Sequence, residues 1–102
     1  MVYQKVPEGS GKEKQVAVSA PDETLKGVYS NHLITIHTRE EFVLDFFNLF
    51  PPKGILSARV ITSPGHLKRF IRVLSKTMEN FEKQFGKVTE AEEPGGDSSP
   101  LP

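Results

Sequence analysis

The stretch RVITSPGHLKRFIRVLSKTMENFEKQFG, residues 59–86, decides the fold of this chain. Its first four residues are typical of a β-strand, and residues 64–85 are predicted to form a helix. Ser63 stands at the N-cap position, where its hydroxyl can accept a hydrogen bond from a backbone N–H of the first turn. Pro64 suits the first helical position, because the N–H that proline lacks would be unpaired there. Gly86 is typical of the residue that ends a helix.

The predicted helix carries one apolar stripe. Large apolar side chains recur along it at spacings of three and four residues, which places them on one side of the helix. That side is expected to pack against another part of the protein. The stripe consists of Leu67, Phe70, Ile71, Leu74, Met78, Phe81 and Phe85.

Three strands are predicted ahead of the helix, at residues 28–38, 42–49 and 55–62. A polar break separates the first two, and the prolines and glycine of residues 51–54 separate the second from the third. Connections this short favour antiparallel neighbours. The predicted fold class is therefore α+β: a three-stranded antiparallel meander followed by one long C-terminal helix.

The composition along the chain predicts the domain boundaries. Residues 26–87 are predicted to form a single α+β domain, because the flanking segments hold few large apolar groups. Residues 1–25 are expected to be mostly disordered, with Val16-Ala17-Val18 as a candidate for an extra edge strand. Residues 88–102 are acidic and then rich in Pro, Gly and Ser, so they are expected to be disordered as well.

The overall composition narrows the classes of function. Lys and Arg number 13 and so do Asp and Glu, and cysteine is absent, which excludes disulfides, thiolate metal sites and cysteine nucleophiles. The first residues lack the apolar region of a secretory signal, and no apolar run approaches the ~20 residues of a membrane span. We therefore expect a cytoplasmic protein that does not enter a membrane, and we predict no cofactor.

The second predicted strand is apolar on both faces, because side chains alternate between the faces of a strand. One helix can cover only one face of a three-stranded sheet, and soluble monomers rarely expose a large apolar patch. A homodimer is therefore predicted. Its interface is expected to combine the uncovered sheet face with the end of the helix, which extends past its own sheet. The predicted interface residues are Val43, Phe47, Ile61, Phe81 and Phe85.

Several short motifs together resemble a known family. They are YSN at 29–31, EFVLDF at 41–46, RVITSP at 59–64 with His66 and Lys68 after it, and FEKQFG at 81–86. Over about residues 26–88 the chain is similar to a family of short bacterial and archaeal proteins, domain-of-unknown-function family number 3467. Phe47 stands where that family more often has Gly, and Phe81 where it more often has Tyr. The resemblance implies a compact strands-plus-helix module and no particular activity.

Candidate catalytic and metal-binding groups are few. Ser63 and His66 could act as nucleophile and base, but no G-x-S-x-G motif accompanies them, and capping of the helix explains Ser63. His32 and His37 are five residues apart on one predicted strand, so they point to opposite faces and cannot share a metal ion there. No metal site and no catalytic residue are predicted.

The acidic residues of the first hairpin are Glu40, Glu41 and Asp45. Two neighbouring carboxylates could carry out acid–base chemistry. Ion pairing with arginine is the favoured interpretation, because structural ion pairs are common. The candidate partners are Arg39, Arg59, Arg69 and Arg72.

The first half of the predicted helix has a basic face, formed by Lys68, Arg69, Arg72 and Lys76. Residues 26–86 hold nine Lys and Arg against five Asp and Glu, whereas the segment from residue 87 holds one against four. The neutral chain thus combines a basic module with an acidic tail. The basic face could contact a nucleic acid or another anion, or it could be a solvated helix face.

The leading functional hypothesis is a homodimeric structural or protein-binding module without catalytic activity. The exposed edge of its sheet could accept a strand from a protein partner. The alternative hypothesis is a nucleic-acid-binding dimer that uses the basic face of the helix.

Overall fold

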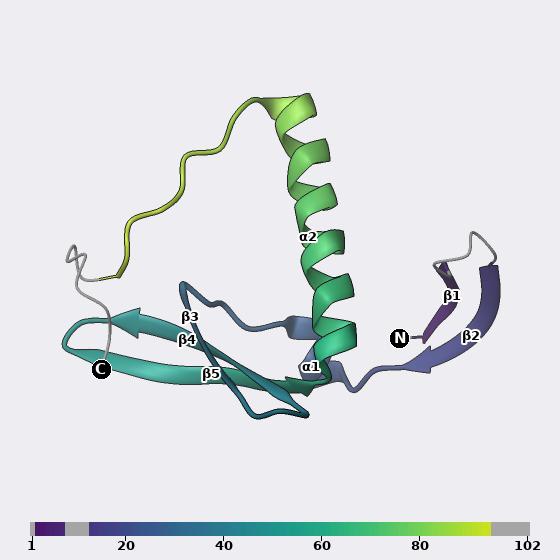
Figure 1. Ribbon diagram of the computed structural model, residues 1–102, viewed down its shortest axis with the longest axis horizontal. Coiled ribbons are helices and arrows are strands. Elements are labelled where there is room, and N and C mark those ends of the chain that lie inside the picture. The colour runs from purple at the N-terminus through teal and green to yellow at the C-terminus, as the bar shows by residue number, and fades with distance from the viewer. Residues whose placement is uncertain (1, 8–12, 95–102) are drawn as a thin grey trace.

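The computed structural model describes residues 2–7 and 13–94 of the chain, with side chains for residues 16–94 (Figure 1). Two antiparallel sheets are formed by separate parts of the sequence. The strands β1 (Val2–Pro7) and β2 (Glu13–Ser19) make a two-stranded sheet. The short helix α1 (Asp22–Lys26) follows and leads to the main sheet.

The main sheet contains three antiparallel strands in the order β3 (His32–His37), β4 (Phe42–Phe50) and β5 (Lys53–Thr62). The long helix α2 (Pro64–Phe85) follows β5 after a single residue. The predicted α+β meander with a C-terminal helix is therefore confirmed. The turn between β4 and β5 is shorter than predicted, because pairing continues to Phe50 and Lys53 on either side of the two prolines.

The ends of α2 follow the local chemistry of the sequence. The Ser63 hydroxyl accepts a hydrogen bond from the His66 N–H at 3.2 Å, which confirms the predicted N-cap. At the other end Gly86 has φ of +96°, a backbone conformation that glycine adopts without a steric cost. Its N–H donates to the Glu82 carbonyl.

Residues 29–31 precede β3 and are joined to the sheet by both side-chain and backbone hydrogen bonds, including one from the Asn31 N–H to the Phe47 carbonyl. The Asn31 side chain accepts from the Leu49 N–H at 2.8 Å and donates to the Leu49 carbonyl at 2.9 Å. The Ser30 hydroxyl donates to the Phe47 carbonyl, and the Ser57 hydroxyl of β5 donates to the Tyr29 carbonyl. These bonds explain why β3 begins at His32 and not near residue 28 as predicted.

The position of α2 differs from the prediction that the helix covers one face of the sheet. The helix makes no extensive contact with any strand and projects away from the sheet (Figure 1). The physical reason lies in the connection. Only Ser63 separates β5 from Pro64, so no loop is available to turn the helix back over its own sheet.

The N-terminal segment contains more secondary structure than the sequence predicted. Residues 16–18 lie in β2, but this strand pairs with β1 and does not extend the main sheet as an edge strand. The elements β1 and α1 were not predicted. Whether residues 26–87 fold as a domain without these elements stays a prediction. The predicted disordered tail lies partly outside the described residues, which end at Pro94.

Candidate functional site

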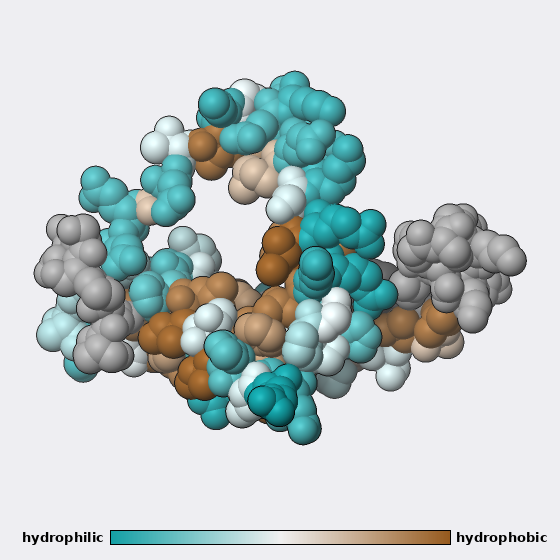
Figure 2. Space-filling model, viewed as in Figure 1, coloured by the Kyte–Doolittle hydropathy of each residue, from teal (hydrophilic) through white to brown (hydrophobic). Residues whose placement is uncertain are grey.

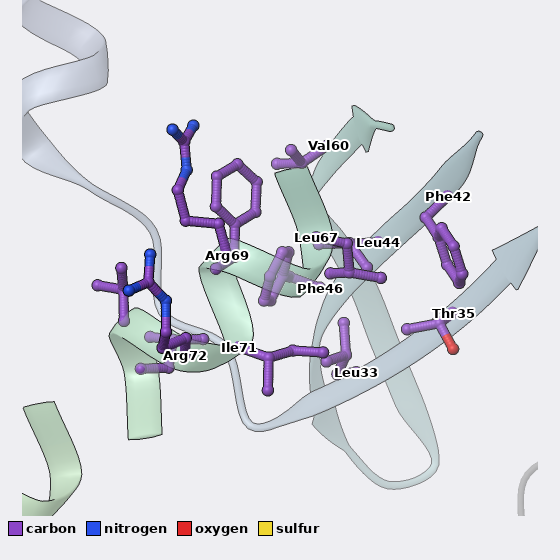
Figure 3. Close-up of a pocket in the computed structure, with 13 residues that line it drawn as sticks. Leu33, Thr35, Phe42, Leu44, Phe46, Val60, Leu67, Arg69, Ile71 and Arg72 are labelled. Carbon is purple, nitrogen blue, oxygen red and sulfur yellow. The ribbon is translucent and has the colours of Figure 1, made fainter. Parts of the chain in front are cut away.

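An apolar groove lies between one face of the main sheet and the first half of α2. Its volume is about 970 Å³, and Figure 3 shows the side chains that line it. Figure 2 shows hydrophobic side chains on the sheet and on the side of α2 that faces it. From the sheet the groove is lined by Leu33, Thr35, Phe42, Leu44, Phe46 and Val60. From α2 it is lined by Leu67, Arg69, Phe70, Ile71, Arg72, Val73 and Leu74.

The strand register explains why these sheet residues share a face. Leu33 is opposite Phe46, Thr35 is opposite Leu44, and Leu44 is also opposite Val60 on the other neighbouring strand. Directly opposed side chains in an antiparallel ladder project from the same face of the sheet. The predicted alternation of side chains along the second strand is thus confirmed, with Leu44 and Phe46 on the same face.

The apolar stripe of α2 is exposed in a single copy of the chain. The exposed fraction is 68% for Leu74, 56% for Ile71 and 66% for Phe85. None of the apolar side chains described for residues 16–94 is buried. Burial of apolar surface is the main term that stabilises a fold. A single copy of this part of the chain therefore lacks the buried core that a stable domain of this size needs.

The opposite face of the sheet is apolar around one ion pair. Ile36, Val43 and Ile61 are opposed across the three strands, so they form one row on this face. Ile36 and Ile61 are more than half exposed, whereas Val43 is half-buried. The next row along the strands contains Ile34, Asp45 and Arg59.

Asp45 and Arg59 form a bidentate ion pair across β4 and β5. The Nε and an Nη nitrogen of Arg59 donate to the two carboxylate oxygens of Asp45 at 2.7 and 2.8 Å. Asp45 is only 4% exposed. The hydrogen bonds from Arg59 hold the pKa of the Asp45 carboxyl below its usual value of 3.8, even though burial acts in the opposite direction. The predicted ion pairing is confirmed for Asp45, with Arg59 as its partner.

The predicted dimer residues fall on two separate surfaces. Val43, Phe47 and Ile61 belong to the sheet face that points away from the groove. Phe81 and Phe85 lie at the far end of the α2 stripe, with their ring centroids 4.9 Å apart. One copy of the chain does not bring these two groups together, so they cannot form one continuous patch on it.

The basic face of α2 is exposed, as expected for side chains opposite the apolar stripe. The Nζ of Lys76 lies 3.5 Å from a carboxylate oxygen of Glu79. Lys68, Arg69 and Arg72 have no carboxylate within ion-pair distance in the described part of the chain. These three cations lie three and four residues apart on α2, so their like charges repel one another without an anionic neighbour.

The remaining candidates do not assemble into a catalytic or metal site. The His66 ring stacks on Phe70 with centroids 6.4 Å apart, and Ser63 serves the helix cap. His32 is opposite Phe47 and His37 is opposite Phe42, so the two histidines project from opposite faces as predicted. Over residues 2–7 and 13–94 no three His, Cys, Asp or Glu side chains are placed to hold a metal ion. Within the same ranges no helix has the length and hydropathy needed to cross a membrane.

The family resemblance is confirmed by comparison with known proteins. The sequence model of one family, described as "Protein of unknown function (DUF3467)", matches residues 3–90. The chain therefore belongs to this family. The match begins well before residue 26, so it includes most of β1 and all of β2 as well as the main sheet and α2. No curated protein and no solved structure matches the chain.

Proposed function

We propose that this member of the DUF3467 family is a homodimeric interaction module with no catalytic activity of its own. The observation that supports this most is the exposed apolar stripe of α2 beside an unfilled apolar groove. Each fully buried Leu, Ile, Met or Phe contributes roughly 1.5–3 kcal/mol to stability. A second copy has both a groove and a stripe, so its stripe can fill the groove of the first copy while its groove covers the stripe of the first copy.

The oligomeric state is tested by sedimentation equilibrium of the full chain at micromolar concentration. We expect a dimer, with far-UV circular dichroism showing both helix and sheet. A matched variant carries a charge on the stripe, Leu74→Glu. It is expected to be monomeric or to lose structure, because a carboxylate in an apolar contact costs several kcal/mol. A wild-type chain that is well folded as a monomer would contradict the proposal.

The dimer leaves surfaces for a protein partner. The strands β3 and β5 form the edges of the main sheet, and an edge strand has unpaired N–H and C=O groups that can bind an extended segment. The sheet face with Ile36, Val43 and Ile61 is a second apolar surface. We infer that a protein partner binds at one of these places, in a cytoplasmic setting.

Nucleic-acid binding is a second candidate function, favoured by one specific observation. Lys68, Arg69 and Arg72 lack acidic partners in the described residues, and Arg69 and Arg72 point away from the stripe at about 100° per residue. Phosphate groups are the anions that such a face would contact.

A gel-shift titration at several salt concentrations tests this second candidate. If the basic face binds a nucleic acid, the logarithm of the affinity should fall linearly with the logarithm of salt concentration. The fourfold variant K68Q/R69Q/R72Q/K76Q should reduce that slope and the affinity. The matched control K26Q/K53Q/K83Q/K87Q removes the same number of charges from other positions. It should change the slope and the affinity less. Equal effects of the two variants, or no shift by the wild type, would contradict the candidate.

A further inference from the structure

We propose that the apolar groove of each copy is filled by the C-terminal half of α2 from a second copy, with the two α2 helices antiparallel about a two-fold axis near Lys76. This inference rests on the proposed homodimer. It adds which segment of the second copy occupies the groove, in which direction it runs and where the symmetry axis lies.

The spacing of the stripe supports direct pairing of two helices. Six of its residues alternate at intervals of four and three, which is the seven-residue repeat of helices packed side by side. They are Leu67, Ile71, Leu74, Met78, Phe81 and Phe85. Each of the two rows contains two intervals of seven residues, at 67–74–81 and at 71–78–85. The six side chains therefore form a continuous seam for a second helix.

An antiparallel arrangement places every seam residue against another. Ile71 meets Phe81 of the second copy, and Leu74 meets Met78 of the second copy. Leu67 meets Phe85 of the second copy, so each layer pairs a residue from one half of α2 with a residue from the other half. All three layers share the same centre, next to Lys76. Because the pairing is reciprocal, each layer occurs twice, as a two-fold axis requires.

The charges along α2 also favour the antiparallel direction. The basic residues Lys68, Arg69 and Arg72 lie in its first half, and the acidic residues Glu79 and Glu82 lie in its second half. A parallel pair would place the two basic halves side by side, which is unfavourable. The second half also contains Lys76 and Lys83, so its net charge is zero. The antiparallel pair therefore places each basic half beside a half without net charge, and it also opposes the two helix dipoles.

One charged pair flanks the seam directly. In the antiparallel register Lys68 and Glu82 of the second copy lie on the same side of the seam, about 3 Å apart along the axis, and symmetry repeats this pair at the other end. Lys68 has no carboxylate within ion-pair distance among the described residues. One carboxylate oxygen of Glu82 accepts from the Val88 N–H at 2.9 Å, which leaves its other oxygen for the lysine.

The groove lies beside the part of α2 that the second helix is proposed to contact. Its helical wall is the first half of α2, including Leu67, Ile71 and Leu74 (Figure 3). The antiparallel neighbour of that half is the second half of the other α2, which carries Phe81 and Phe85. These two rings then enter the space between the helix and the sheet. The surface that the helix leaves uncovered on its own sheet is covered by the helix of the other copy.

Distances between spin labels test the arrangement in the full chain, which has no cysteine of its own. Single cysteines are introduced by Lys68→Cys, Thr77→Cys and Gln84→Cys, at positions that flank the seam. With a rise of ~1.5 Å per residue, an axis near residue 76 separates the two copies of a label by roughly 3 Å along the helix at position 77. The corresponding separation is roughly 24 Å at positions 68 and 84.

The pattern of the three distances distinguishes the outcomes. A short distance at 77 with long ones at 68 and 84 supports the antiparallel pair. Short distances at all three positions would show a parallel pair and overturn the inference while leaving the dimer intact. Absence of any distance between copies would show a monomer, which overturns the proposed function as well. The three labels act as controls for one another, because all lie on the same helix.

A charge exchange tests the register without labels. Lys68→Glu and Glu82→Lys should each weaken the dimer, since each places like charges opposite each other. The double variant K68E/E82K should restore it towards the wild-type dissociation constant. The matched control is Lys83→Glu, on the same helix but away from the seam. Failure of the double variant to recover would overturn the proposed register.

A distance between labels on the two copies tests whether the second copy's α2 lies in the groove. One copy carries a label at Thr35, which lines the sheet side of the groove, and the other carries a label at Gln84. A short distance between them in the mixed dimer supports occupation of the groove. A distance as long as that between two Gln84 labels would show that the helices pair outside the groove, and would overturn this part of the inference.

Discussion

Truncation of Leu74 gives the sharpest test of whether a second copy covers α2. In a single copy this side chain is 68% exposed, so Leu74→Ala should change the stability of an isolated chain by no more than ~0.5 kcal/mol. In the proposed dimer the same side chain packs against Met78 of the second copy. Removal of a buried Leu side chain costs ~2–5 kcal/mol, and the dimer contains the change twice.

The expected effect on the dimer is therefore ~4–10 kcal/mol. With ~1.4 kcal/mol for each tenfold change, the dissociation constant should rise by at least roughly three orders of magnitude. Sedimentation equilibrium over a range of concentrations measures this directly. The matched control is Ile55→Ala, which truncates a side chain that is 57% exposed and does not line the groove. A dissociation constant that changes equally in both variants would refute the reasoning.

Three further predictions concern the fold. Ser63→Ala should cost about 1 kcal/mol, because it removes the acceptor for the His66 N–H, whereas Ser63→Thr should be nearly neutral; chemical denaturation measures both, and an unchanged midpoint for the alanine variant would contradict the cap. The Asp45 pKa is lowered in the folded state, so the stability that its ion pair contributes is present above the usual pKa of 3.8 and is lost as pH falls through the lower folded value. Acid unfolding of Asp45→Asn should lack this component, and an identical acid profile for wild type and variant would argue against it. A chain of residues 24–88 should retain the circular dichroism of the main sheet and α2, and an unfolded product would show that β1 and β2 are needed.

Local signals predicted the ends of α2 better than any other feature. Ser63, Pro64 and Gly86 act within one turn of the helix, so their effect can be derived without knowledge of the rest of the fold. The faces of β4 were also predictable, because alternation along a strand does not depend on its neighbours. The start of β3 was placed too early, since nothing in the β-rich pattern showed that Ser30 and Asn31 bind the backbone of β4 through their side chains.

The position of α2 and the N-terminal sheet could not be derived in the same way. The stripe shows that α2 must be covered, but its spacing does not say by which surface. The N-terminal strands did have a sequence signal: a Gly-Ser-Gly segment at 9–11 between short runs with valine. That signal was outweighed by the many polar residues around it. Asp45 pairs with Arg59 because the register of β4 and β5 places them opposite each other. The sequence alone does not give this register, so it could not distinguish Arg59 from the other candidate arginines.

The apolar stripe and the basic face of α2 lie on different sides of the helix. Dimer formation and nucleic-acid binding can therefore use different surfaces of the same helix. At about 100° per residue, Arg69, Arg72 and Lys76 lie on the side opposite Leu67 and Leu74. A dimer built on the stripe therefore does not place these cations in its seam, although Arg69 and Arg72 also line the groove. The positions of the three cations average about four residues from the proposed axis, so the two basic faces of the dimer lie roughly 11 Å apart along the helices. An anionic polymer that spans this separation would contact both faces, whereas a small anion would contact only one. Dimerisation would then raise the affinity for a polymer through two linked contacts, and a variant that is monomeric but folded would lose that gain.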